Sequence, residues 1–152
     1  MIEVIPHSGV LTMEHASFLI WDKGEVESEI LLVTKKKAPG VWGMPGGQSK
    51  PGESPLTTMY RETIEEIGFT LENPMEIVRC LVEDPSPHLF IAFAGYNGTP
   101  NPMEKIRIGP EIEFAVFFPG RQIDGLITAG LVRPRHAYAI QEYRRVHCYN
   151  EL

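Results

Sequence analysis

The sequence predicts one mixed α/β domain, with helices packed against a layered β-sheet. The 152 residues are enough for a single domain with a substantial core. The hydrophobic fraction of 43% is ordinary for a globular protein. Segments with the periodicity of strands alternate along the chain with segments that have the periodicity of helices. Residues 1–152 are therefore expected to form one layered domain.

The expected strands are short apolar or alternating segments bounded by turn residues. The first two, Ala16–Trp21 and Ile30–Val33, flank the polar segment DKGEVES. Two more, Met75–Val82 and Leu89–Ala94, flank the proline-containing segment EDPSPH. A fifth is expected at 111–118, where alternation predicts one shared face for Ile112, Phe114, Val116 and Phe118.

Residues 38–53, with the sequence APGVWGMPGGQSKPGE, are so rich in glycine and proline that we expect irregular backbone there. A helix is expected to follow, with Ser54 as its N-cap and Pro55 in the first helical position. The helix should end near Ile67, because Gly68 can supply a left-handed C-cap.

Two further helices are expected toward the end of the chain. One covers Gln122–Leu131 and is weakened by Gly125 in its interior. The other begins at Pro134 and continues to about Cys148.

The helix that follows Ser54 has two distinct faces when its residues are placed about 3.6 to a turn. Glu62, Glu65 and Glu66 project from one of these faces. A separate arc is expected to face the core, and it consists of Leu56, Tyr60, Thr63, Ile64 and Ile67.

Composition excludes several classes of function. The formal net charge of −6 argues against a broad basic surface for nucleic acid. No apolar run is long enough to span a bilayer, and the N-terminal residues do not resemble a secretory signal, so we expect no membrane association. Cys80 and Cys148 have no metal-ligand spacing and are expected to be free thiols in a cytoplasmic protein.

Two groups of residues are expected to have ordinary roles, the C-terminal arginines as solvated surface and the histidines as polar side chains. The arginines near the C-terminus are Arg133, Arg135, Arg144 and Arg145. The histidines, which share no metal-ligand spacing, are His7, His15, His88, His136 and His147. The basic run Lys35–Lys37 differs from both groups, because it directly precedes the glycine-rich segment.

The cluster of glutamates is the strongest indication of chemistry in the chain. Like charges at i, i+3 and i, i+4 repel each other, and the helix dipole disfavours anions in its last turn. The only basic residue in this helix is Arg61, and we expect it to leave the repulsion largely unrelieved. A bound divalent cation such as Mg²⁺, which prefers oxygen ligands, would remove the repulsion. The cluster therefore predicts a metal-assisted phosphate site.

The spacing of these residues resembles the Nudix box. Its pattern reads Gly-x5-Glu-x7-Arg-Glu-U-x-Glu-Glu-x-Gly-U, where U is a bulky apolar residue. All the fixed positions are present, and they are Gly47, Glu53, Arg61, Glu62, Glu65, Glu66 and Gly68. Thr63 and Phe69 are mild departures at the two U positions, and neither changes the charged groups. Upstream, WGMPGG at 42–47 resembles the Trp-x-x-Pro-Gly-Gly segment found in many members.

The resemblance implies an α/β/α sandwich with a mixed β-sheet, and hydrolysis of a pyrophosphate bond in a nucleotide. It implies that Glu62, Glu65 and Glu66 bind Mg²⁺ or Mn²⁺, assisted by the backbone carbonyl of Gly46 or Gly47. It also implies that Glu53 pairs with Arg61 and holds the loop against the helix. A bidentate arginine–carboxylate contact suits this role, and a lysine would not replace it.

The general base is left open by the resemblance. One of the three helix glutamates can accept the proton of the attacking water, and so can an acidic residue outside the motif. The outside candidates are Glu104, Glu111 and Glu113. We prefer Glu111, because it lies at the start of the strand expected at 111–118.

The substrate is also left open. Lys35 and Lys37 are candidates for contacts with phosphates, while Phe18 and Trp42 are candidates for contacts with a base, as are Phe90 and Phe118. The implied substrate is a nucleoside triphosphate or a nucleoside diphosphate linked to another moiety. The alternatives are hydrolysis at the 5′ end of RNA and a non-catalytic domain that senses nucleotides. A homodimer is open as well, with strand 112–118 as the candidate interface.

Overall fold

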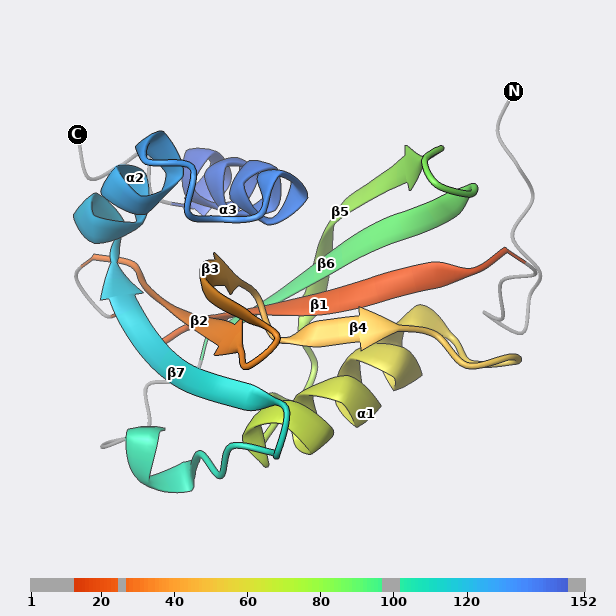
Figure 1. Cartoon of the computed structure of the whole chain (residues 1–152), viewed down its shortest axis with the longest axis horizontal. Coiled ribbons are helices and arrows are strands. Elements are labelled where there is room, and N and C mark those ends of the chain that lie inside the picture. The colour runs from red at the N-terminus through yellow and green to blue at the C-terminus, as the bar shows by residue number, and fades with distance from the viewer. Residues whose placement is uncertain (1–12, 25–26, 97–101, 148–152) are drawn as a thin grey trace.

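The computed structural model describes residues 13–24, 27–96 and 102–147. Within this part of the chain, a mixed β-sheet lies between helix α1 (Pro55–Ile67) on one side and helices α2 (Gly120–Thr128) and α3 (Pro134–His147) on the other (Figure 1). The expected α/β/α sandwich is therefore confirmed. None of the described helices is both long enough and apolar enough to cross a membrane.

The sheet contains seven strands among the described residues, and its main path runs β3-β2-β1-β6-β5. Strand β4 pairs with β1, and strand β7 pairs with β2. A short 3₁₀ helix, η1 (Pro102–Lys105), precedes β7. The strands are β1 (His15–Asp22), β2 (Glu29–Lys35), β3 (Ala38–Gly43), β4 (Gly46–Gln48), β5 (Met75–Val82), β6 (His88–Tyr96) and β7 (Ile112–Pro119).

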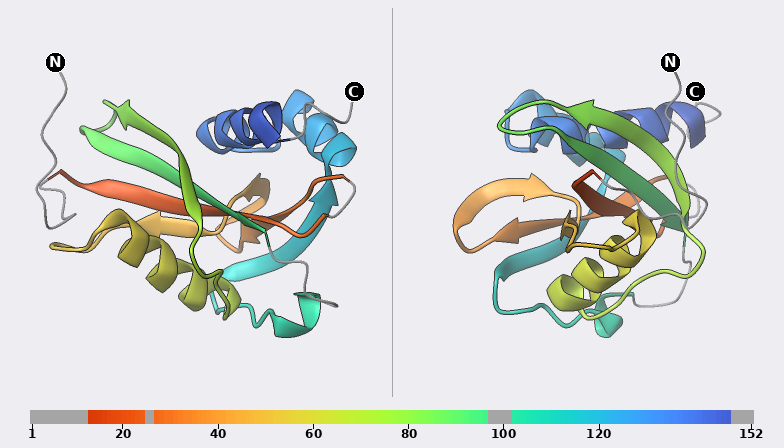
Figure 2. Two further views of the ribbon diagram at one scale, coloured as in Figure 1. Left: turned by 180° about the vertical axis from the view of Figure 1, so that it is seen from behind. Right: turned by 90° about the vertical axis from the view of Figure 1, so that its right-hand side faces the viewer.

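Strand β1 is the centre of the sheet and has different partners on its two edges. On one edge it pairs in parallel with β6 along its whole length. On the other edge its beginning pairs with β4, and its pairing with β2 is registered only at Asp22 and Ile30. Strands β1 and β2 therefore diverge, and β4 brings the glycine-rich loop beside β1 and above α1 (Figure 2).

Two hydrophobic clusters fill the layers on either side of the sheet. The cluster beneath α2 and α3 includes Ile20, Ile30 and Ile140, all fully buried. The cluster against α1 includes Trp21 and Met59, which are also fully buried. Burial of such side chains on both faces stabilises the sandwich, since each contributes about 1.5–3 kcal/mol.

The prediction of irregular backbone throughout residues 38–53 was wrong, because β3 and β4 lie within it. Strand β3 is at the end of the sheet path, so Pro39 need not donate a ladder hydrogen bond. Gly46 in β4 has a φ of +144°, and a Cβ there would lie 2.3 Å from the carbonyl oxygen of Ser17. Glycine therefore permits this strand pairing instead of preventing it.

The predicted ends of α1 are confirmed. The backbone N–H of Thr57 donates to the hydroxyl of Ser54 over 3.2 Å, as expected of an N-cap. Gly68 adopts a φ of +71° and donates its N–H to the carbonyl of Ile64 over 3.0 Å. These two local interactions set the length of the helix.

The predicted core face of α1 was wrong in part. Leu56 and Ile64 are 37% and 50% exposed, whereas Glu66 is buried. The helix packs on β1 and β4 through one stripe with the spacing i, i+4, i+7 and i+8. This stripe consists of Met59, Thr63, Glu66 and Ile67, and Tyr60 lies half-buried beside it. One of the three glutamates, Glu66, therefore belongs to the buried stripe and not to a face separate from the core.

The predicted face of β7 was also wrong, because the strand contains a register shift opposite Thr34 and Lys35. The shift places Ile112 with Ala115 and Phe117 in the cluster against α1. Phe118 packs against the other cluster, and Phe114 is 56% exposed. A homodimer contact through this strand stays a prediction.

Helix α2 begins two residues earlier and ends three residues earlier than expected, at Gly120 and Thr128. Helix α3 begins at Pro134 as expected and is described as far as His147. Cys148 lies outside the described residues, and Cys80 is a half-buried free thiol.

Candidate active site

Arg61 is the centre of the charged network on α1. Its Nε and Nη2 atoms donate to the two carboxylate oxygens of Glu53 over 2.7 and 2.9 Å, so the expected pair is present in bidentate form. Glu53 also accepts hydrogen bonds from the N–H of Lys50 and the hydroxyl of Thr58. The hydrogen bond from Arg61 is the main reason that the pKa of Glu53 is lowered to about 2.

Arg61 also relieves the repulsion among the glutamates, contrary to the sequence-based expectation. Its Nη1 donates to Glu62 over 2.8 Å and lies 3.4 Å from the carboxylate of Glu65, four residues further along the helix. Its Nη2 additionally donates to the carbonyl of Gln48 over 2.9 Å. The guanidinium thus ties the end of β4, the loop containing Glu53 and helix α1 into one unit.

Glu66 has a different environment, because it is 5% exposed and faces β4. Its Oε1 accepts the backbone N–H of Gly46 over 2.8 Å, and its Oε2 lies 3.6 Å from the ammonium of Lys35. Burial raises the pKa of Glu66 to about 7, although the Gly46 N–H and Lys35 act in the opposite direction. This carboxyl group therefore changes its protonation state near neutral pH.

Two positions near the carboxylates have no room for a side chain, and glycine occupies both. A Cβ on Gly47 would lie 2.6 Å from the carboxylate carbon of Glu62, so any side chain there would displace that carboxylate. A Cβ on Gly109 would lie 2.2 Å from the carbonyl oxygen of Glu65. The N–H of Gly109 instead donates to the carbonyl of Glu66 over 2.9 Å, and this helps to satisfy the C-terminal end of α1.

Among the described residues, no three histidine, cysteine or acidic side chains converge as a ready-made metal site. The reason is visible in the contacts: Glu62 and Glu65 turn toward Arg61, and Glu66 turns toward Gly46 and Lys35. The donor set nevertheless fits a hard divalent cation, because it consists of carboxylate oxygens beside a glycine backbone. Glu62 and Glu66 also line the same cavity together with Gly47.

That cavity has a volume of about 640 Å³ and is lined by three chemically different groups of side chains, which are carboxylates, cations and aromatic rings. The side chains are Glu62 and Glu66 with Glu111; Lys35, Lys37, Arg133 and Arg135; and Phe18, Phe90 and His136. A second cavity of about 290 Å³ beside it is lined by Glu62, Glu65, Glu66, Pro110, Glu111 and Ile112.

Glu111, the preferred candidate base, lines both cavities. Its carbonyl accepts the N–H of Lys36 over 3.0 Å, so the backbone at Glu111 is anchored beside the end of β2. Glu104 and Glu113 line neither cavity.

Four of the six predicted substrate contacts line the larger cavity, and they are Phe18, Lys35, Lys37 and Phe90, whereas Trp42 and Phe118 do not line it. The rings of Trp42 and Phe118 instead pack edge-on against each other, with the ring centroids 4.8 Å apart. Trp42 belongs to the hydrophobic packing beneath the helices.

The C-terminal arginines, which were expected to be ordinary surface, fall into two pairs with different surroundings. Arg133 and Arg135 line the cavity, whereas Arg144 and Arg145 form surface pairs with Asp124 and Glu142. No spacing along the sequence links the start of α3 to α1. The connection arises only because α3 begins at the edge of the cavity.

His136 was also interpreted as an ordinary polar residue, but it is a buried part of the cavity wall. Its Nδ1 accepts the backbone N–H of Met44 over 2.8 Å. Burial, with smaller contributions from Arg133 and Lys35, lowers the pKa of His136 to about 3. The imidazole is therefore neutral at physiological pH.

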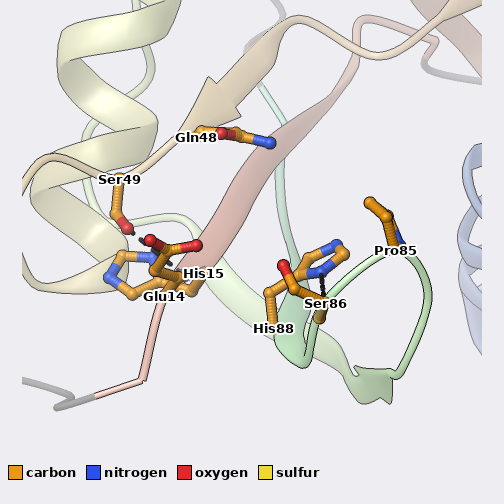
Figure 3. Close-up of a pocket in the computed structure, with 7 residues that line it drawn as sticks. All are labelled: Glu14, His15, Gln48, Ser49, Pro85, Ser86 and His88. Carbon is orange, nitrogen blue, oxygen red and sulfur yellow. Dashed lines mark hydrogen bonds between the residues drawn. The ribbon is translucent and has the colours of Figure 1, made fainter.

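His15 is a second histidine with a defined structural role. It is 2% exposed, and its Nε2 donates to the backbone carbonyl of Glu53 over 2.8 Å. Figure 3 shows it at one end of a small pocket of about 100 Å³, with Ser49 beside it and His88 and Ser86 opposite. His15 thus fixes the loop that carries Glu53 to the start of β1.

Comparison with known proteins extends the likeness well beyond the motif. The family model of the NUDIX domain matches residues 13–143. A nucleoside triphosphate pyrophosphatase/Nudix hydrolase fusion protein of Bifidobacterium longum is 44% identical over 48 residues, which are 32% of this chain and 10% of that protein. Diphosphoinositol polyphosphate phosphohydrolase 2 of Mus musculus is 41% identical over 46 residues, which are 30% of this chain and 26% of that protein. This chain thus covers only a minor part of these curated relatives.

Several solved structures share the fold. The NUDIX domain of Shewanella oneidensis NrtR, complexed with ADP ribose, has a TM-score of 0.71 at 13% identity, covering 93% of this chain and 92% of that one. A NUDIX hydrolase from Nitrosomonas europaea has a TM-score of 0.69 at 18% identity, covering 88% and 90%. Such low identities establish the architecture alone. The family match does more, because it spans most of the sequence and includes the whole charged network: the chain belongs to the NUDIX domain family.

Proposed function

We propose that this chain hydrolyses a pyrophosphate bond in a nucleotide substrate and uses Mg²⁺ or Mn²⁺ as its cofactor. The observation that carries the proposal is the cavity that the carboxylates of Glu62 and Glu66 line together with Lys35, Arg133 and other cations. A polyphosphate chain with a bound cation combines both signs of charge, as does this cavity. Its volume of about 640 Å³ lies within the range of small-molecule sites.

Glu62, Glu65 and Glu66 would hold the cation, with the carbonyl of Gly46 or Gly47 as a further oxygen donor. When bound, the cation supplies neutralisation of phosphate charge and lowers the pKa of water. For the carboxylates to turn toward a cation, they must exchange their contacts with Arg61 and Lys35. Lys35 would then be free to contact a phosphate oxygen within the same cavity.

Proton transfer falls to a carboxylate that does not hold the cation, and Glu111 is the candidate. The pKa of about 7 for Glu66 belongs to the metal-free protein, in which this carboxyl must lose a proton before it binds a cation. Glu111 lines both cavities and is exposed, so it is accessible to water on either side of Glu62. Arg61 takes no part in proton transfer, and its bidentate contact with Glu53, which is not a cation ligand, keeps the loop against α1.

Three of the relatives support the nucleotide class of substrate, whereas the name of the diphosphoinositol polyphosphate phosphohydrolase of Mus musculus contains no nucleotide. One solved neighbour holds ADP ribose, another is described as an Ap4A hydrolase from C. elegans, and one curated relative is named a nucleoside triphosphate pyrophosphatase fusion. These names have in common a nucleoside joined to two or more phosphates. They leave open which base is bound and which bond is cleaved.

The first test is incubation with Mg²⁺ or Mn²⁺ and a panel of nucleoside triphosphates, ADP-ribose, dinucleoside polyphosphates and 5′-triphosphorylated RNA. Released phosphate, pyrophosphate and nucleotide are measured. We expect turnover of at least one free nucleotide that is lost in EDTA. A faster rate on the RNA, falling steeply with salt, would assign the RNA alternative instead.

The matched variant is Glu66→Gln, with Glu76→Gln on β5 as a control outside the described cavities. Because the amide oxygen of the introduced glutamine can still accept the Gly46 N–H, we expect the fold to persist while kcat/KM falls by roughly 10²–10⁴-fold. The Glu76→Gln rate should match the wild type. Nucleotide binding without hydrolysis by the wild type under any condition would favour the sensor alternative, and an undiminished Glu66→Gln rate would remove Glu66 from the mechanism.

A further inference from the structure

The imidazole of His136 is enclosed on one side by the backbone before β4. Nδ1 accepts the N–H of Met44, and a Cβ on Gly43 would lie 2.9 Å from Nδ1 and 3.1 Å from Cε1. The rings of Phe18 and Phe90 stand against it in edge-on geometry, with centroids 4.5 and 5.5 Å away. Since His136 also lines the cavity, its remaining edge, which carries Nε2, is the one that reaches the cavity.

The hydrogen bond from Met44 determines where the proton of this neutral ring lies. An N–H donates to Nδ1, so Nδ1 has no proton and Nε2 carries it. Nε2 has no hydrogen-bond partner within the described part of the chain. Among the described residues, the polar side-chain atoms that are fully enclosed and have no hydrogen-bond partner are Trp21 Nε1 and Thr34 Oγ1. Nε2 of His136 also has no partner but is not among these atoms. It is therefore not fully enclosed and retains access to the cavity. A 5% exposed side chain thus presents one unused donor and no acceptor.

The surroundings of Nε2 indicate what it binds. Phe18 and Phe90 stack with centroids 5.1 Å apart and, together with His136, form the aromatic wall of the cavity. A neutral donor adds no charge for a phosphate, and the phosphates have Lys35, Arg133 and the other cations at the same cavity. A planar, uncharged ring with an acceptor on its edge matches an aromatic wall that contains a single donor.

We propose that Nε2–H of His136 donates a hydrogen bond to an acceptor atom on the nucleobase of the substrate, and that this contact determines which base is bound. The inference rests on the proposed function only in taking the substrate to be a nucleotide. A base edge that presents a ring nitrogen or carbonyl oxygen is accepted. An edge that presents an amino group would place its N–H against the Nε2–H of His136, so a base with that edge is rejected.

Two substitutions separate the two nitrogens of the ring. His136→Asn keeps an oxygen near the position of Nδ1 for the Met44 N–H but removes the donor to the cavity. His136→Gln keeps a donor near the position of Nε2 but leaves the Met44 N–H without its acceptor. Tyr138→Asn, on the same helix and 51% exposed, controls for placing asparagine in α3.

The experiment measures dissociation constants by calorimetry with Mg²⁺, using α,β-methylene analogues of ATP, GTP, CTP and UTP, and inorganic tripolyphosphate as a ligand without a base. Urea denaturation measures stability in parallel. For the best-bound analogue, we expect His136→Asn to raise the dissociation constant about ten-fold, as for one lost hydrogen bond. Its dissociation constant for tripolyphosphate should stay within about two-fold of the wild type, because no hydrogen bond to phosphate is lost. His136→Gln should bind the analogue more tightly than His136→Asn but be less stable.

The proposal is overturned if the ratio of nucleotide affinity to tripolyphosphate affinity is the same in His136→Asn as in the wild type. This holds whether both affinities are unchanged or both fall by the same factor. The outcomes also distinguish this inference from the proposed function. Nucleotide binding that depends on His136 without any hydrolysis supports the inference and removes the hydrolase assignment. Hydrolysis with affinities that do not depend on His136 supports the hydrolase assignment and overturns the inference. Failure to bind any nucleotide overturns the inference and the proposed function together.

Discussion

At the scale of single residues, Arg61 decides the state of the charged cluster. One guanidinium contacts three carboxylates and a backbone carbonyl, those of Glu53, Glu62, Glu65 and Gln48. The planar fork of arginine makes this geometry feasible, since its donors point in several directions within one plane. Lysine has the same charge but cannot engage Glu53 with two parallel bonds while also reaching Glu62.

We therefore expect Arg61→Lys to lower kcat/KM by about 10–100-fold, as is typical when a group that orients the ligands is lost. Stability should fall by about 1–3 kcal/mol, because hydrogen bonds to charged partners are removed. The control is Arg79→Lys, which alters another bidentate pair, that of Arg79 with Glu76 on β5. If both variants lose the same amount of activity, the network around Arg61 has no special role.

At the scale of elements, helix α1 carries acidic residues in its last turn, where their negative charge is unfavourable. Acidic residues near a helix C-terminus oppose the dipole. The structure offsets this in two ways: Gly68 caps the helix, and the N–H groups of Arg107 and Gly109 donate to the carbonyls of Ile67 and Glu66. The segment before β7 therefore completes the last turn of α1.

The other end of α1 depends on a single side chain, the hydroxyl of Ser54. We expect Ser54→Ala to reduce the free energy of unfolding by about 1 kcal/mol, and Ser54→Gly by only a few tenths. Urea denaturation followed by circular dichroism measures both. Since Ser54 lies outside both cavities, the metal concentration needed for half-maximal activity should not change. Equal effects of alanine and glycine would show that the hydroxyl does not cap the helix.

At the scale of the whole molecule, two buried titratable groups on different layers give stability opposite dependences on pH. His136 has a folded-state pKa of about 3, below the ordinary 6.5, so its contribution is full above pH 6.5 and is lost as the pH falls toward 3. Glu66 has a folded-state pKa of about 7, above the ordinary 4.5. Between pH 4.5 and 7 the folded protein therefore binds a proton that the unfolded chain lacks, and stability falls as the pH rises.

Comparison of the wild type with Glu66→Gln isolates the second effect, because glutamine does not titrate. In EDTA, the stability of the wild type relative to the variant should decline from pH 4.5 to pH 7 and level off above it. Urea denaturation at four pH values across this range measures the difference. A difference that stays constant, or that grows with pH, would mean that the pKa of Glu66 is not raised by burial.

Several features of the active site were predictable from short-range sequence alone. The N-cap at Ser54, the C-cap at Gly68 and the pair between Glu53 and Arg61 each depend on residues within one loop and one helix. Their geometry follows from about 3.6 residues per turn and from the donors that each residue type carries. The burial of Glu66 was not predictable in this way, because it depends on β4 packing against the helix.

The sequence by itself determined the carboxylate set, the helix that presents it and the layered α/β class, because these arise from local spacing and periodicity. Only the tertiary structure decided what faces the carboxylates. Lys35 comes from β2, Arg133 from the residue before α3 and His136 from its first turn, and all three line one cavity with carboxylates of α1. Lys35 also approaches Glu66 directly. Contacts of this kind depend on strand order and layer packing, to which no spacing along the chain corresponds. Trp42 illustrates the same limit in reverse, since it lies in the sequence between Lys37 and Gly47, which both line the cavity, while its ring packs into the core.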